Sequence, residues 1–457
     1  MRRLCLLRSF ALPLFCTLSL SFLVPTVVGE VSLQEAERYG ESVRARWPKE
    51  QPIDEVRLLR QGVRRFEGKH STFYTDLASL ESVDELLIVF DLMVPQLCEY
   101  FELNPKKYES WKAEIFLVGN ATTFEKSGAL DQVPKLRNGY ALRNRIWLRD
   151  QPSEYYRRHL LIHEGVHAFM GYAFGRWGPP WYREGTAELL GTHRWVEGQL
   201  TLGHLPQNAD EVPNWRRIVI VRDDFAKKEG KRIEDVFRLA PEDYDENAAY
   251  AWSWGFAAFC EHHPHYRTAF RHTARYLSRP ASELSEHFLR LIGEAAAERL
   301  NDDWVDFVAN IDFGYDFHRT RIDDFSSGKA LSDDGAVVSV RADRGWQNSG
   351  LRLEKGQTHE LTAEGRFQLG RTPKIWWSEP NGITVRYHRG IPIGTLLAAL
   401  LPDSDADFAT PKVVGTGVTW SVEQSGTLFF RINDFASELD DNDGNATVNI
   451  KPFLRSP

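Results

Sequence analysis

The sequence predicts a multidomain protein in which an α+β domain is followed by a C-terminal β-sandwich. Its 457 residues, 42% of them hydrophobic, are enough for more than one buried core. Strand and helix patterns alternate up to about residue 150, and mainly helical patterns follow up to residue 322. Beyond residue 335 the segments are short, alternating and rich in Gly, Pro and Asp, as in a sandwich. We expect domains over 30–322 and 336–457, joined by a linker over 323–335.

The first 29 residues are predicted to be a secretory signal peptide. Arg2, Arg3 and Arg8 precede an apolar run over residues 10–24, and small residues near Gly29 offer a cleavage site. A membrane anchor is the alternative, but no later segment is long and apolar enough to span a bilayer. We therefore expect a secreted, periplasmic or cell-surface protein with no membrane span after signal removal.

Charge and cysteine content narrow the function classes. The net charge is -8, and the signal segment carries arginines but no acids, so the mature chain is more acidic still. Binding to nucleic acid needs a basic surface that this chain lacks, and that class is excluded. Two cysteines remain after signal removal, Cys98 and Cys260. A disulfide between them and two buried thiols both remain open.

The α+β domain begins with alternating elements and continues with helices. Alternation and apolar periodicity predict strands over 71–77, 112–120 and a pair within 138–150, and helices over 82–101, 157–174, 182–190, 250–263 and 267–277. Strands of the C-terminal domain are expected over 336–342, 359–369, 418–424, 427–432 and 446–450.

The helix over 157–174 carries the segment HEGVH. Residues four apart share one helix face, so His163 and His167 can present ring nitrogens to one metal ion, with Glu164 beside it. The surrounding helix is apolar, and burying these groups is costly unless they are paired or bind a metal. Core polar groups satisfied by one another are the alternative.

A catalytic zinc usually takes three protein ligands and keeps one position open. Met170 and Ala173 occupy the positions where a metzincin motif has glycine and histidine, so that class is excluded. Glu184 and Glu188 share one face of the next helix. Glu184 would be the third ligand, and Glu188 would fix the tautomer of a ligand histidine. A solvated helix charge is the alternative for each.

The segment WYREGTAEL, residues 181–189, following HEGVH resembles the gluzincin metallopeptidases of the peptidase-MA-like family. The resemblance covers roughly residues 65–310. It implies zinc held by His163, His167 and Glu184, with Glu164 as general base and the strand near 137–148 along the substrate backbone. Gluzincins often use a tyrosine or histidine from a later helix as oxyanion donor, and Tyr250 is the candidate. A core role among neighbouring aromatic residues is the alternative for Tyr250.

A second metal question arises in the C-terminal domain. Between two predicted strands, the loop after residue 432 concentrates oxygen donors that suit calcium, above all Asp434, Asp441 and Asn442. A solvated acidic turn is the alternative.

The run from residue 345 onward resembles the calcium-dependent galactophilic lectin family of bacteria. That resemblance places Asp434, Glu438, Asp441 and Asn442 at the calcium positions and brings a backbone carbonyl near Leu369. Two departures concern the ligands: Asp441 stands where Asn is usual, and Glu379 replaces the histidine that contacts sugar. The resemblance implies calcium and glycan binding without fixing the sugar.

Together these features favour a secreted zinc-dependent peptidase that acts on peptides or proteins and carries a lectin-like module. The alternative from another class is an inactive carbohydrate-binding or adhesive surface protein on a peptidase-like scaffold. The zinc centre could also hydrolyse a bond other than a peptide, because the motif specifies water activation and not the acyl group.

Overall fold

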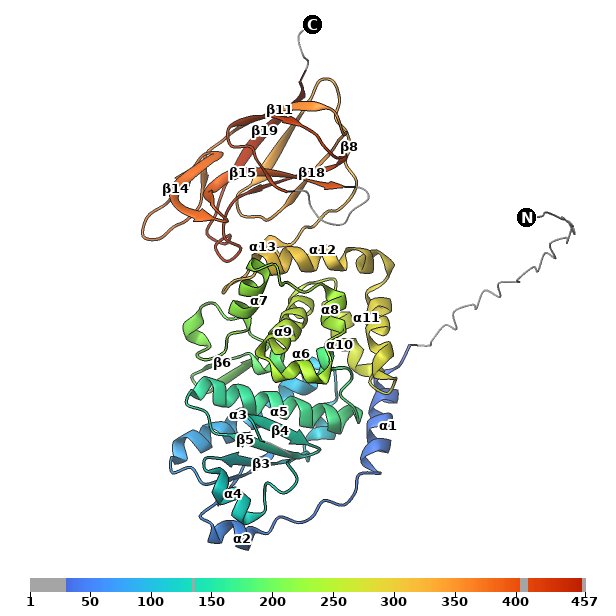
Figure 1. Cartoon of the computed structure of the whole chain (residues 1–457), viewed down its shortest axis with the longest axis vertical. Helices are drawn as coiled ribbons and strands as arrows, with labels where there is room; N and C mark the ends of the chain where they lie inside the picture. Colours follow the sequence, from blue (N-terminus) through green and yellow to red (C-terminus); the bar gives the residue numbers. More distant parts are fainter. Residues whose placement is uncertain (1–29, 134–135, 403–409, 454–457) are drawn as a thin grey trace, which may run out of the picture.

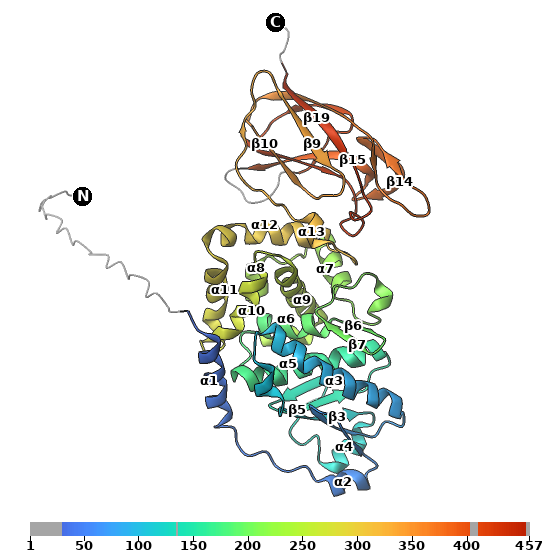
Figure 2. The ribbon, with the colours of Figure 1, turned by 180° about the vertical axis from the view of Figure 1, so that it is seen from behind.

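The structure is a computed structural model that describes residues 30–133, 136–402 and 410–453 (Figure 1). A sheet-containing part, a layer of helices and a β-sandwich follow one another along the long axis, and both views show this order (Figures 1 and 2). The predicted signal segment, residues 1–29, lies outside the described residues.

A five-stranded sheet with the order β1-β2-β3-β5-β4 forms the base of the first part. The three inner strands are parallel, β2 (Ser71–Thr75), β3 (Ala113–Val118) and β5 (Arg145–Arg149). The edge strands β1 (Arg64–Glu67) and β4 (Gly139–Leu142) run antiparallel to their neighbours. The strand pair expected within 138–150 is confirmed, and its turn residue Arg143 has a φ of 56°.

Helix α5 (Glu154–Phe174) carries HEGVH and is buried along most of its length. Ser153 caps its first turn, and Gly175 ends it in the left-handed conformation. Helix α6 (Pro180–Gly191) starts with Pro180, whose missing N–H would have had no partner there. A side chain at Gly185 would lie 2.7 Å from the carbonyl oxygen of Ser253, so glycine permits close packing of α6 on α9 (Asn247–His262).

The remaining helices of this part surround that core. They are α1 (Leu33–Arg44), α2 (Glu55–Arg60), α3 (Leu80–Tyr100), α4 (Ala121–Ser127), α7 (Arg217–Ala226), α8 (Ile233–Phe237), α10 (Arg267–His272), α11 (Leu284–Ile292), α12 (Glu294–Asn310) and α13 (Phe317–Thr320). In the described residues, no helix is both long and apolar enough to cross a bilayer. Cys98 and Cys260 are free and buried, so of the two alternatives the structure has two buried thiols and not a disulfide between them.

One hairpin interrupts the region predicted to be mainly helical. Strands β6 (His193–Val196) and β7 (Gln199–Leu202) pair antiparallel through a two-residue turn. Glu197 and Gly198 both have positive φ, 51° and 77°, as this hairpin turn requires. The pairing, and not helical periodicity, decides the structure of this short segment.

The C-terminal part is a sandwich of two sheets, which confirms the predicted β-rich class. One sheet has the order β14-β15-β18-β10-β8 with β16 beside β15, and the other has the order β17-β11-β19-β9. The strands are β8 (Lys329–Ala330), β9 (Ala336–Arg341), β10 (Gln347–Leu353), β11 (Thr358–Glu364), β12 (Phe367–Gln368), β13 (Trp377–Ser378), β14 (Asn381–His388), β15 (Ile391–Pro402), β16 (Lys412–Val413), β17 (Gly417–Ser421), β18 (Gly426–Ile432) and β19 (Asn445–Pro452). Strand β8 lies inside the predicted linker and pairs with β10.

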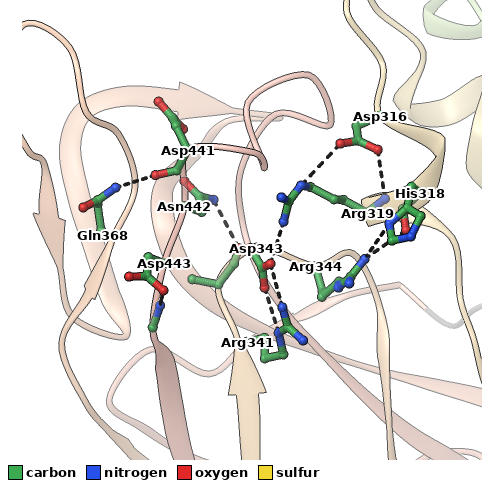
Figure 3. A network of polar contacts seen from close by, with 12 residues as sticks. Asp316, His318, Arg319, Arg341, Asp343, Arg344, Gln368, Asp441, Asn442 and Asp443 are labelled. Carbon is green, nitrogen blue, oxygen red and sulfur yellow. Dashed lines mark hydrogen bonds and ion pairs between the residues drawn. The ribbon is translucent and has the colours of Figure 1, made fainter.

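Polar contacts join the last helix of the first part to the sandwich (Figure 3). Asp343 accepts hydrogen bonds from Arg319 of α13 at 2.6 Å and from Arg341 at 2.8 and 2.7 Å. On the same side, Arg344 donates to the carbonyl oxygen of His318 at 3.0 Å. Ala436 of the sandwich packs into the hydrophobic core of the first part. Hydrogen bonds and an ion pair with charged side chains of the C-terminal domain therefore hold helix α13 against that domain.

Candidate metal centre and C-terminal loop

Helices α5 and α6 bring His163, His167 and Glu184 together. The Nε2 atoms of the two histidines lie 3.1 Å apart, and Glu184 Oε2 lies 3.3 Å from each of them. Ligands held at about 2.1 Å by a tetrahedral zinc lie about 3.4 Å from one another, so the three atoms fit one ion. Their side chains are 6%, 12% and 8% exposed, respectively, which leaves His167 nearest to solvent.

A second group that could hold a metal shares His163. It consists of His159, His163 and Glu188, all buried. Arg217 donates two hydrogen bonds to the Glu188 carboxylate, both of 2.9 Å, so a cation there would lie against a guanidinium. That repulsion favours the group formed by His163, His167 and Glu184 as the metal site.

Glu188 lies where the sequence predicted a partner of a ligand histidine. Its Oε1 is 3.4 Å from His163 Nδ1, while His163 Nε2 faces Glu184. A proton on Nδ1, the nitrogen that faces Glu188, would leave Nε2 free for a metal. Arg217, from α7, holds Glu188 in this orientation.

Charge in the cluster is balanced between imidazoles and carboxylates. Burial alone would raise the pKa of Glu184, but the charges of His167 and His163 and their hydrogen bonds outweigh it and hold that pKa well below its usual range. Burial also opposes ionisation of Glu188, whose pKa is nevertheless held low, chiefly by the charges of Arg217 and His159. Both carboxylates are therefore negative and attract a cation.

Glu164 projects toward the edge strand of the sheet. A side chain at Gly139, the first residue of β4, would lie 2.4 Å from Glu164 Oε1. Burial raises the pKa of Glu164 above its ordinary value. A carboxyl group with a raised pKa, beside an antiparallel edge strand, has the properties of a general base at neutral pH.

The contact between Gly139 and Glu164 predicts a specific variant effect. In Gly139→Ala, the new methyl group would displace the Glu164 side chain, to which the three atoms nearest the added carbon all belong. We expect bound metal to be retained and kcat to fall by about 10-fold or more, because such misplacement of a catalytic group is costly. Steady-state kinetics with metal analysis checks this, and an unchanged kcat would contradict the placement of Glu164.

Tyr250 lies at the same centre. Its ring centroid is 6.2 Å from that of His163, and the Arg217 guanidinium lies 5.5 Å from the Tyr250 centroid. Burial, followed by the negative charges of Glu184 and Glu188, raises the pKa of Tyr250 above its ordinary value. The phenol therefore stays protonated and can donate a hydrogen bond.

In the C-terminal domain, Asp434 and Asn442 are in contact within a buried loop. Asn442 Nδ2 donates to Asp434 Oδ2 at 3.0 Å and to the carbonyl oxygen of Ala342 at 3.1 Å. Asn442 Oδ1 and Asp441 Oδ1 are buried without a hydrogen-bond partner in the described residues. Burial raises the pKa of Asp434 to about 6. An orphaned oxygen on Asn442, the residue that contacts this buried carboxylate, fits a calcium ligand.

The other two calcium candidates contribute less through their side chains. The Glu438 carboxylate accepts hydrogen bonds of 2.6 and 2.9 Å from Arg386, so its charge is already paired. Leu369 has a buried side chain, and its neighbour Gln368 donates to the backbone carbonyl of Asp441 at 2.5 Å (Figure 3). The Glu438 side chain is therefore taken up by Arg386, and the apolar side chain of Leu369 offers no ligand atom.

Calcium should stabilise the C-terminal domain if these oxygens bind it. We expect calcium at 100 times its Kd to add about 2.7 kcal/mol of stability, with the loss of this gain in Asp434→Asn. Asp440→Asn is the matched control, since Asp440 is an exposed acid of the same loop. Thermal unfolding with and without calcium measures the effect, and an equal response of both variants would exclude Asp434 as a ligand.

Four residues of these sites were not predicted. His159 precedes His163 by four residues, so the spacing of 159, 163 and 167 on one helix face was an available signal. Arg217 and Gly139 had no such signal, because their contacts join elements distant in sequence. Arg183 directly precedes Glu184 and donates to Glu184 Oε1 at 2.7 Å.

No family model and no curated protein matches this chain. Among solved structures, 72 chains match. One of them is described as the EclA N-terminal domain, a PllA-like lectin. The C-terminal region resembles it with 21% identity and a TM-score of 0.22, over 27% of this chain and 100% of that chain. At that identity and score, the likeness adds nothing to the β-sandwich already evident from the strand pairing.

Proposed function

We propose that the protein is a secreted zinc-dependent peptidase that hydrolyses peptide bonds in peptides or proteins. The observation that carries the proposal is the approach of His163 Nε2, His167 Nε2 and Glu184 Oε2 to within 3.1–3.3 Å of one another. Glu164 on the same helix, facing an antiparallel edge strand, adds the base that a hydrolase needs. The proposed secretion rests on the sequence of residues 1–29 alone.

The three ligands would hold zinc, which when bound lowers the pKa of a water molecule and polarises a carbonyl group. Glu188, held by Arg217, faces His163 Nδ1 and would keep the proton of the metal-bound ring on that nitrogen, so that Nε2 can bind zinc. The Glu164 carboxylate accepts the proton of the attacking water and passes it to the leaving amine. The Tyr250 hydroxyl donates a hydrogen bond to the carbonyl oxygen as its negative charge develops.

Metal removal and restoration tests the proposal. We expect the purified protein to contain about one zinc per chain and to cleave peptides, to lose cleavage after chelation, and to regain it with zinc. Elemental analysis and a peptide library with free and blocked termini measure both properties. A protein that binds no transition metal, or that cleaves nothing when loaded, would support the adhesive alternative instead.

We also propose that the C-terminal domain binds glycans with the help of calcium and holds the peptidase on a glycan or glycoprotein. The contact of Asn442 with buried Asp434, together with the unpartnered side-chain oxygens of Asn442 and of its neighbour Asp441, supports this proposal. Glycan-array binding with and without calcium tests this, and binding independent of calcium would separate the two properties.

A further inference from the structure

Arg183 is the one arginine of the candidate metal centre that reaches solvent. Of the cations in the described residues that contact the metal-ligand cluster, Arg217 has a side chain only 6% exposed, while that of Arg183 is 33% exposed. Arg217 is also fully engaged by Glu188. Of these two arginines, Arg183 is therefore the one that a substrate could reach.

The Arg183 guanidinium is held beside the metal ligands by one of its nitrogens. Its Nε donates to Glu184 Oε1 at 2.7 Å, while the other oxygen of that carboxylate faces both histidines. Its Nη groups donate no hydrogen bond within the described residues. Arg183 is thus held by one hydrogen bond and, with a third of its side chain exposed, keeps its Nη donors available to a ligand.

The position of Arg183 relates it to the reaction as well as to the metal. Its positive charge lowers the pKa of both Glu164 and Tyr244, although burial raises each of them more, so Arg183 lies near the proposed general base as well as near the metal ligands. The carboxylates of the centre already have partners, since Glu184 faces His163 and His167 and Glu188 is paired with Arg217. An accessible guanidinium beside the candidate metal ligands is a binding group for a carboxylate, which it can contact through two parallel hydrogen bonds.

We propose that Arg183 binds a carboxylate of the substrate close to the scissile bond, so that the peptidase prefers acidic peptides. This inference rests on the proposed peptidase function. The carboxylate belongs to an Asp or Glu side chain or to the C-terminus of the substrate. Arg183 acts as a specificity-determining residue and also orients Glu184.

Two substrate series test the proposal with wild type, Arg183→Met and Arg183→Lys. One series carries Asp or Glu, Asn or Gln, or Lys at each position next to the scissile bond, with an amidated C-terminus. The other has neutral side chains and either a free or an amidated C-terminus. We expect wild type to favour one kind of carboxylate by about 10- to 100-fold in kcat/KM. Arg183→Met should reduce this preference to within about 2-fold, and Arg183→Lys should retain part of it.

Binding to an inert protein gives a second readout. Acidic peptides should bind Glu164→Gln more tightly than their amide analogues, and the double variant with Arg183→Met should bind both equally. Arg176→Met is the matched control, because exposed Arg176 stacks on Tyr39 and contacts no candidate ligand. It should leave the preference unchanged.

The outcomes separate this inference from the proposed function. Zinc-dependent cleavage without an acidic preference overturns the inference alone. A preference that survives in Arg183→Met also overturns the inference. The same holds if Arg183→Met cleaves all peptides more slowly by an equal factor while the preference for acidic peptides stays intact. A wild type that cleaves no peptide when loaded with zinc overturns both.

Discussion

Glu164→Gln should abolish most of the peptidase activity while the zinc content stays unchanged. Glutamine keeps the size of the side chain and its place beside Gly139, but it cannot accept a proton. Loss of a general base typically costs about 10²- to 10⁴-fold in kcat. Because Glu164 belongs to neither group of candidate metal ligands, elemental analysis should still find one metal per chain.

Glu184→Gln provides the contrast to that variant, since it alters a candidate ligand and should weaken zinc retention during dialysis. Equal cleavage by wild type and Glu164→Gln would refute the proposed base. Parallel loss of zinc from both variants would show instead that Glu164 helps to hold the metal.

Arg217→Met should lower the stability of the fold by about 3–5 kcal/mol, the usual consequence of leaving one partner of a buried ion pair alone. The Arg217 and Glu188 side chains are 6% and 3% exposed, and two hydrogen bonds join them. Methionine fills similar space but leaves Glu188 charged and uncompensated. Thermal or denaturant unfolding measures the loss.

Arg222→Met is the matched control on the same helix. Arg222 also donates twice to one carboxylate, that of Asp312, but the two side chains are 47% and 36% exposed. A solvated pair contributes about 0–1 kcal/mol, so this variant should remain close to wild type. Equal destabilisation by both variants would mean that burial of the pair formed by Arg217 and Glu188 does not increase the stability lost when the arginine is removed. Arg217→Met should also weaken zinc binding, because Glu188 would no longer be held against His163.

The helix faces of the candidate metal centre were predictable from the sequence because local periodicity determines them. His163 and His167 lie on one turn of α5, and Glu184 and Glu188 lie on one turn of α6, so their spacing in the chain gives their relation in space. The strand pair within 138–150 and the helix expected over 182–190 were predictable for the same reason. Each depends on the conformational preferences of a few adjacent residues.

Contacts between distant segments could not be read in this way. Arg217 reaches Glu188 from 29 residues away, and no pattern in the chain marks that pairing. The Arg386 pair with Glu438 likewise depends on the register of β14 against the loop after β18. The β6–β7 hairpin was missed because four-residue strands give too short an alternation to distinguish them from a loop.

The contacts between α13 and the C-terminal domain affect how the proposed peptidase and glycan-binding activities would work together. Arg319 and Asp343 tie the sandwich to the helical part, and Ala436 adds an apolar anchor. A glycan bound by the sandwich would then be held at a fixed distance from the proposed zinc centre. Cleavage would then occur at a preferred distance from the glycosylated residue of the substrate.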